Sequence, residues 1–81
     1  MKHAREDYNR IQDPDGLIPE DEPVFLLRAQ DVVSVQTVET WARLAEESGA
    51  DPDIVHRARR HANEMRKWHN KKIPDLPKNK D

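Results

Sequence analysis

The segment SVQTVETWARLAEESGADPDIVHRARRHANEMRKWHNKK, residues 34–72, carries the pattern that decides the fold. Its first part has apolar side chains at every third or fourth position, which is typical of an amphipathic helix. These side chains are Val35, Val38, Trp41, Ala42, Leu44 and Ala45. Ser34 is a residue type favoured as an N-cap, and Gly49 is typical of the position just after a helix. We therefore predict a helix over residues 34–48.

A second helix is expected to follow almost at once. Asp51 has a side chain suited to an N-cap, and Pro52 suits the first helical position, where its missing N–H is not needed. The apolar arc of this helix consists of Ile54, Val55, Ala58, Ala62 and Met65, with Trp68 at its margin. Because Pro74 forbids continuation, we predict a helix over residues 52–71. So short a connection predicts an antiparallel two-helix hairpin.

The segment VFLLRAQ, residues 24–30, is the densest apolar stretch before these helices. Its length and its place between Pro23 and Asp31 favour a buried strand. A helix remains the alternative, since Leu, Arg, Ala and Gln are good helix formers and Pro23 suits a first turn. The sequence offers no convincing second strand, and a lone strand leaves its N–H and C=O groups unpaired. We therefore expect this segment to pair with its copy in another protomer.

The two ends of the chain are expected to be irregular. Residues 1–23 form an acidic arm with a Pro-Asp-Gly turn signal at residues 14–16, and residues 73–81 form a tail. The expected fold is a single domain over residues 1–81 that is mostly α with a short β element. It consists of a strand followed by an antiparallel two-helix hairpin, assembled as a homo-oligomer.

Composition gives a separate reason to expect assembly. The chain has 81 residues, of which 37% are charged, and its lack of cysteine excludes disulfides and thiolate metal ligands. A chain this small buries only about 60% of its unfolded surface and is marginally stable alone. A partner chain or a ligand would supply the missing burial. No apolar run approaches the ~18–20 residues of a membrane helix, so we expect a cytoplasmic protein without membrane contact.

The net charge of −2 conceals a strong asymmetry. Residues 1–53 carry five Lys or Arg and 13 Asp or Glu, a balance of −8, whereas residues 54–81 carry nine against three, a balance of +6. Such a chain could attract its own copies or pack its acidic part on its basic part. The alternative is two solvated surfaces that differ in charge.

One border of the second helix carries a candidate ligand site. Four side chains follow one another there at helical spacing: Arg57, His61, Glu64 and Trp68. Guanidinium, imidazole and indole groups suit a small anionic or aromatic ligand. The predicted ligand-binding residues are Arg28, Arg57, Arg60, His61 and Trp68. The alternative is structural, with the indole covering the helix–helix seam and the charged groups at its rim.

The histidines do not have the spacing of a metal site. His56 and His61 are five residues apart, whereas a helix chelates through residues three or four apart. His61 and His69 fall on the apolar arc, where we expect half-buried imidazoles unless they contact a ligand. With two serines and two glycines the chain shows no nucleophile elbow or phosphate-binding loop. We therefore expect no metal, no cofactor and no enzyme activity.

The other border of the second helix carries a stripe of arginine and asparagine: Arg59, Asn63, Arg66 and Asn70. Such a stripe could hold phosphates and offer amides to bases. The acidic balance of the whole chain argues against nucleic acid, since folded DNA-binding domains are usually basic. A solvated face is the favoured interpretation. The stripe could also dock the acidic residues 20–22 of a neighbouring chain.

The sequence EPVFLLRAQD, residues 22–31, followed by a tryptophan-bearing helix and a second helix, resembles small uncharacterised proteins of phage and prophage genomes. The resemblance covers residues 20–70 and brings no catalytic motif. It implies a non-enzymatic anti-defence protein in the host cytoplasm that sequesters a nucleotide signal or another phosphorylated small molecule. A module that masks a host or phage protein is the alternative, and nucleic-acid binding is a third hypothesis.

Overall fold

The structure, a computed structural model, describes residues 1–4 and 13–74 of the chain. Its elements in chain order are β1 (Lys2–His3), β2 (Pro23–Val24), α1 (Ser34–Glu47) and α2 (Pro52–Arg66). The prediction of a mostly α fold with a short β element is confirmed. Part of the predicted arm, residues 5–12, and the predicted tail from residue 75 onward lie outside the described residues.

Helix α1 begins where the sequence predicts, but Ser34 does not have the predicted role. Val33 occupies the N-cap position and makes no side-chain capping bond. Ser34 is already helical and fully buried, and its hydroxyl donates to the carbonyl oxygen of Asp31 at 2.9 Å. The end of α1 follows the prediction closely, because Gly49 adopts a left-handed φ of 84° just after the helix.

The N-terminus of α2 has the predicted cap. The Asp51 carboxylate accepts a hydrogen bond from the backbone N–H of Asp53 at 2.9 Å, and Pro52 is the first helical residue. The C-terminus differs from the prediction, since α2 ends at Arg66 and not at residue 71. A proline at position 74 limits how far a helix can continue but does not determine where it stops.

Tertiary pairing explains the early end of α2. The Lys71 ammonium group donates to the carbonyl oxygens of Met65 and Ala29, both at 2.7 Å. The backbone N–H of Lys72 donates to the carbonyl of Gln30 at 2.7 Å, and the carbonyl of Lys72 accepts from Val32 at 2.9 Å. These bonds need an extended backbone after α2, and they tie it to the chain that leads into α1.

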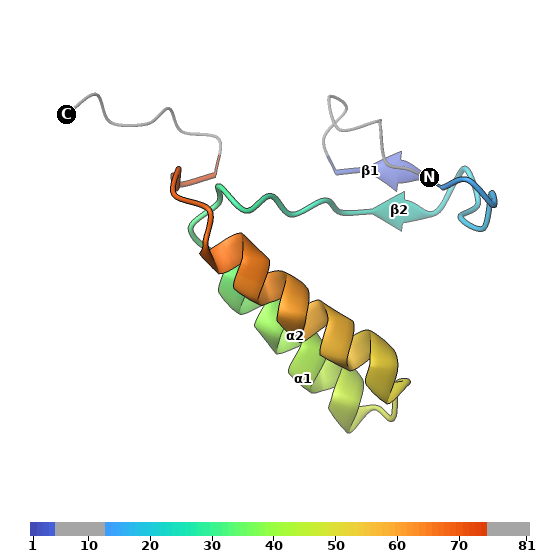
Figure 1. The fold of residues 1–81 in the computed structure, drawn as a ribbon. Helices are drawn as coiled ribbons and strands as arrows, with labels where there is room; N and C mark the ends of the chain where they lie inside the picture. Colours follow the sequence, from blue (N-terminus) through green and yellow to red (C-terminus); the bar gives the residue numbers. More distant parts are fainter. Residues whose placement is uncertain (5–12, 75–81) are drawn as a thin grey trace.

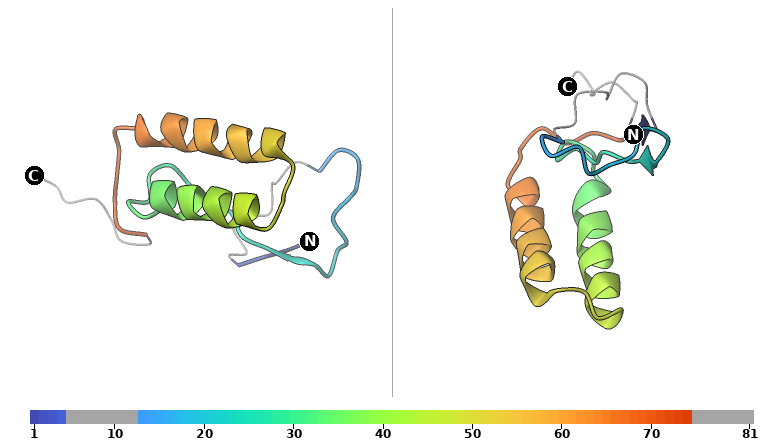
Figure 2. Two further views of the ribbon diagram at one scale, coloured as in Figure 1. Left: turned by 90° about the horizontal axis from the view of Figure 1, so that it is seen from below. Right: turned by 90° about the vertical axis from the view of Figure 1, so that its right-hand side faces the viewer.

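The two helices lie side by side and project from the rest of the described chain (Figures 1 and 2). Small side chains form the seam between them. Among the described residues the buried apolar side chains are Ala42, Val55, Ala62 and Met65. Two of these four are alanines, so the helices approach closely but bury little apolar surface.

The β element is shorter than predicted and has a partner in its own chain. β1 and β2 pair in parallel, with Lys2 opposite Pro23 and His3 opposite Val24. The predicted strand over residues 24–30 is therefore correct only at its first residue, and residues 25–28 follow an irregular, extended path toward α1 (Figure 1). The expected pairing of this strand with another protomer is therefore wrong, because β1 of the same chain supplies the partner strand.

The predicted turn in the arm is present. Gly16 has a φ of 62°, and its N–H donates to the carbonyl of Asp13 at 3.0 Å. The Asp13 carboxylate also accepts from the backbone N–H groups of Leu17 and Ile18, each at 3.0 Å. This arrangement satisfies the turn locally, as the Pro-Asp-Gly signal predicts.

Candidate interaction surfaces of the helical hairpin

Large apolar side chains lie exposed on both helices. Trp41 and Leu44 on α1 are 51% and 50% exposed, and Ile54 on α2 is 44% exposed. We call Trp41, Leu44 and Ile54 the apolar face. All three were predicted to lie on the apolar arcs that pack the helices together, and their exposure shows that this prediction is wrong for them.

A shallow groove accompanies the apolar face on α1. Its volume is about 390 Å³, and it is lined by Gln36, Thr37, Thr40, Trp41 and Leu44. Thr37, Thr40 and Gln36 lie beside the indole, and none of the lining side chains is charged. The groove therefore offers a partner a continuous, largely uncharged surface along one side of α1.

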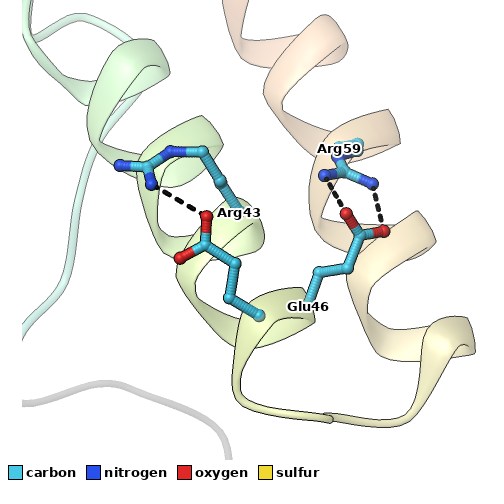
Figure 3. Close-up of polar contacts among 4 residues, drawn as sticks. Arg43, Glu46 and Arg59 are labelled. Atoms are coloured by element: carbon cyan, nitrogen blue, oxygen red, sulfur yellow. Dashed lines mark hydrogen bonds and ion pairs between the residues drawn. The ribbon is translucent and has the colours of Figure 1, made fainter.

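Ion pairs join the two helices elsewhere on their surface. Arg59 holds Glu46 through two contacts, 3.1 Å and 3.3 Å long (Figure 3), and Arg66 holds Glu39 at 2.8 Å. Each pair links a glutamate of α1 to an arginine of α2. We call these four residues the ion-paired face.

Helical geometry places the two faces on different sides of the hairpin. An α-helix turns about 100° per residue, so side chains two positions apart point about 200° apart. Trp41 and Leu44 each lie two residues from a glutamate of the ion-paired face. On α2, Arg57 and His61 each lie two residues from Arg59, which also belongs to the ion-paired face. The apolar face therefore lies opposite the ion-paired face, with Arg57 and His61 on its side.

The Glu46–Arg59 pair also shifts the acidities of both groups. The hydrogen bonds and positive charge of Arg59 lower the pKa of Glu46 below its usual value of 4.5. The same contacts raise the pKa of Arg59. Both groups are solvent-exposed, so water screens the pair and its main effect is to fix how the helices lie against each other.

Three of the five predicted ligand-binding residues come together on α2. Arg57, Arg60 and His61 line a shallow depression of about 330 Å³ together with Glu64. Arg28 lies in the irregular segment before α1, and Trp68 follows the end of α2 and is exposed. Neither of these two lines the depression.

Some of the charged side chains around this depression are ion-paired and others are not. Arg57 pairs with Asp53 at 3.3 Å, and Glu64 pairs with Lys67 at 3.6 Å. Within residues 1–4 and 13–74, no acidic side chain pairs with Arg60. An anion in this depression could therefore bind the Arg60 guanidinium without displacing an acidic side chain of the described residues.

His61 and His69 are both exposed, so the expectation of half-buried imidazoles is wrong for both. His61 lies on the outer surface of α2. His69 lies beyond the end of α2, since the helix stops at Arg66, and so it no longer belongs to the predicted apolar arc. Neither imidazole contributes to the seam.

The arginine–asparagine stripe is turned largely toward α1. Arg59 and Arg66 both belong to the ion-paired face, and Arg66 also donates to the side-chain oxygen of Asn63. Asn70 lies beyond the helix. Two cations of the predicted nucleic-acid stripe are thus held by glutamates of the same chain, as the interpretation that acidic and basic parts pack together predicts.

The described ranges contain no cluster of three or more His, Asp or Glu side chains placed to hold a metal ion. No helix in them is long and apolar enough to cross a membrane. No protein-family model, curated protein or solved structure matches the chain.

The exposure of Trp41 and Leu44 was not predicted from the sequence. A signal was present in α1, because its apolar positions span more than one helical stripe. Val38 and Ala42 fall on the seam, whereas Trp41 and Leu44 lie on the neighbouring stripe. An apolar arc wider than one contact with a second helix requires indicates a second contact surface.

Proposed function

We propose that this protein is a non-enzymatic binding module that works as a homo-oligomer and contacts other proteins through its antiparallel helical hairpin. The observation that carries the proposal is the apolar face, where Trp41, Leu44 and Ile54 are about half exposed. Trp41 and Leu44 line one groove together, and an exposed apolar patch on a small domain marks an interaction site. The resemblance to phage and prophage proteins supports a setting in which such a module masks a protein of the phage or its host.

Affinity capture with the full chain tests this proposal. Two differently tagged copies are co-expressed, so that self-association and capture of another protein are both detected. We expect one stoichiometric protein with the wild type and loss of it with Leu44→Glu. Phe25→Ser is the matched control, because Phe25 is also exposed but lies outside the hairpin. Capture of nothing, or equal capture by wild type and Leu44→Glu, contradicts the proposal.

A second candidate function is binding of a phosphorylated small molecule, such as a nucleotide signal. The specific observation behind it is the depression lined by Arg57, Arg60 and His61, in which Arg60 has no acidic partner among the described residues. Guanidinium groups bind phosphate oxygens through paired hydrogen bonds. This proposal keeps three of the five predicted ligand-binding residues, namely the three on α2.

Isothermal titration against a panel of nucleotides tests this second function. We expect heat with one member of the panel, and a Kd weakened at least tenfold by Arg60→Gln. Arg43→Gln is the matched control, since Arg43 is an exposed arginine of α1 that pairs with Glu47. No heat across the panel, or the same loss with both variants, rejects the small-molecule function.

A further inference from the structure

We propose that Met1, Lys2 and His3 bind one Cu²⁺ ion when the α-amino group of Met1 is free. The four ligands are the amino nitrogen of Met1, the backbone nitrogens of Lys2 and His3, and Nδ1 of the His3 imidazole. These residues lie in and next to β1, apart from the helical hairpin (Figure 1). The copper site is therefore independent of the proposed function.

The covalent spacing allows the four nitrogens to surround one ion in a plane. Two atoms, a Cα and a carbonyl carbon, separate each nitrogen of Met1, Lys2 and His3 from the next, so each neighbouring pair closes a five-membered ring with the metal. Nδ1 of His3 closes a six-membered ring with the backbone nitrogen of the same residue. Square-planar nitrogen ligands select Cu²⁺ or Ni²⁺, and Cu²⁺ is the more tightly bound of the two.

The imidazole nitrogen that this ligand set uses lacks a partner in the structure. Nδ1 of His3 is buried, and it makes no hydrogen bond within the described residues. A buried polar atom without a partner is costly, and an ion that belongs to the site is one explanation for it. The unpaired atom is the ring nitrogen that can close the six-membered ring, which supports a metal ion as the missing partner.

The expectation of no metal rested on the spacing of histidine side chains. Three of the four ligands proposed here are terminal or backbone nitrogens, which such spacing does not reveal. Metal ligands must be deprotonated. The ion therefore takes the place of one proton on each of the Lys2 and His3 amides, and both protons pass to water.

Copper binding competes with the pairing of β1 and β2. The backbone N–H of Lys2 donates to the carbonyl of Glu22 at 2.6 Å, and that of Ala4 donates to Val24 at 3.2 Å. Because a strand alternates along its length, the nitrogens of Lys2 and His3 point to opposite sides in β1, whereas the planar site needs both on one side. The ion must therefore release β1 from β2. Since two hydrogen bonds are lost, the chain should bind Cu²⁺ roughly tenfold more weakly than the peptide Met-Lys-His-Ala.

Titration of the purified full chain with Cu²⁺, followed by visible absorption and electron paramagnetic resonance, tests the site. Intact mass first verifies that Met1 is present and its amino group free. We expect one tight equivalent with four nitrogen ligands, and an affinity about a hundredfold lower in His3→Ala. His69→Ala is the matched control, because His69 is an exposed histidine outside both helices, and it should keep the tight equivalent. One glycine added before Met1 leaves His3 intact but moves it to the fourth position, and should abolish tight binding.

NMR with Ni²⁺, which is diamagnetic in square-planar geometry, tests the ligand set directly. The amide proton signals of Lys2 and His3 should disappear, and that of Ala4 should shift as β1 leaves β2. Persistence of the Lys2 and His3 signals contradicts the site. Copper binding that is as tight in His3→Ala or in the glycine-extended chain as in the wild type also overturns it, as does a chain whose Met1 is absent or blocked. Loss of the tight equivalent in His69→Ala places copper elsewhere.

Discussion

Replacing Lys71 with methionine should destabilise the fold more than the loss of any ordinary surface charge. The Lys71 ammonium group donates to the carbonyl oxygens of Met65 and Ala29, each at 2.7 Å. Met65 is in the last turn of α2, where its carbonyl also accepts from the backbone N–H of Trp68 at 3.2 Å, and Ala29 precedes α1. The Lys71 side chain thus stabilises the C-terminal end of α2 and joins it to the segment just before α1.

The size of the effect follows from the two bonds. A hydrogen bond to a charged group contributes about 1.5–3 kcal/mol, and a buried acceptor left without a donor adds a cost. Methionine keeps most of the aliphatic stem, so the packing loss is small. Because the site is half-buried, water replaces part of what is lost. We therefore expect a loss of about 2–4 kcal/mol in the free energy of unfolding.

Urea unfolding followed by circular dichroism measures this loss, at a fixed protomer concentration because assembly would shift apparent stability. Lys67→Met is the matched control, since the Lys67 ammonium lies 3.6 Å from Glu64 on the exposed surface. That change should cost about 0–1 kcal/mol. If Lys71→Met does not fold at all, Lys71→Arg keeps the donors and should recover the helical signal. Equal losses for the Lys71→Met and Lys67→Met variants would refute the reasoning.

Three further predictions concern the helices. Asp51→Ala removes the N-cap of α2 and should cost about 1 kcal/mol in urea unfolding, more than Asp53→Ala; equal costs would exclude a capping role. Because Arg59 lowers the pKa of Glu46, the pair stabilises the fold fully above pH 4.5, and this contribution disappears as the pH falls through the lowered pKa. NMR titration should show the Glu46 pKa rising toward 4.5 in Arg59→Gln, and an unchanged pKa would contradict the pairing. Ala62→Leu overfills the closed seam and should cost about 1–3 kcal/mol, so an unaltered unfolding curve would indicate a loose seam.

The helices could be predicted because their signals are local. The Asp51 cap, the proline that follows it and the left-handed Gly49 each act within a few residues of where they stand. Periodicity within one helix also brought Arg57, Arg60 and His61 together correctly, since side chains three or four residues apart share a surface. These features do not depend on what the distant parts of the chain do.

The errors arise where distant segments meet. The residues around Arg66 carry no helix-ending signal such as proline or glycine, and after α2 the backbone of Lys72 pairs instead with Gln30, far away in the sequence. The strand over residues 24–30 was predicted too long because β1, a two-residue strand with no apolar pattern, was not recognised as its partner. Trp68 was placed on the ligand site by extending helical spacing past the true end of α2. Each error is a tertiary contact overriding a local preference.

The uneven distribution of charge along the chain has a structural role beyond solubility. Glu39 pairs with Arg66, and Glu46 pairs with Arg59. Part of the acidic charge of residues 1–53 and part of the basic charge of residues 54–81 therefore hold α1 against α2. Those pairs occupy one side of the hairpin and leave the other side with its large apolar residues exposed. Among the described residues the buried apolar side chains are Ala42, Val55, Ala62 and Met65, so the seam between the helices buries little apolar surface. Because Glu39 and Glu46 are already paired with arginines of their own chain, a partner that docks on the other side of α1 would meet the uncharged groove beside Trp41 and Leu44 and not these charges.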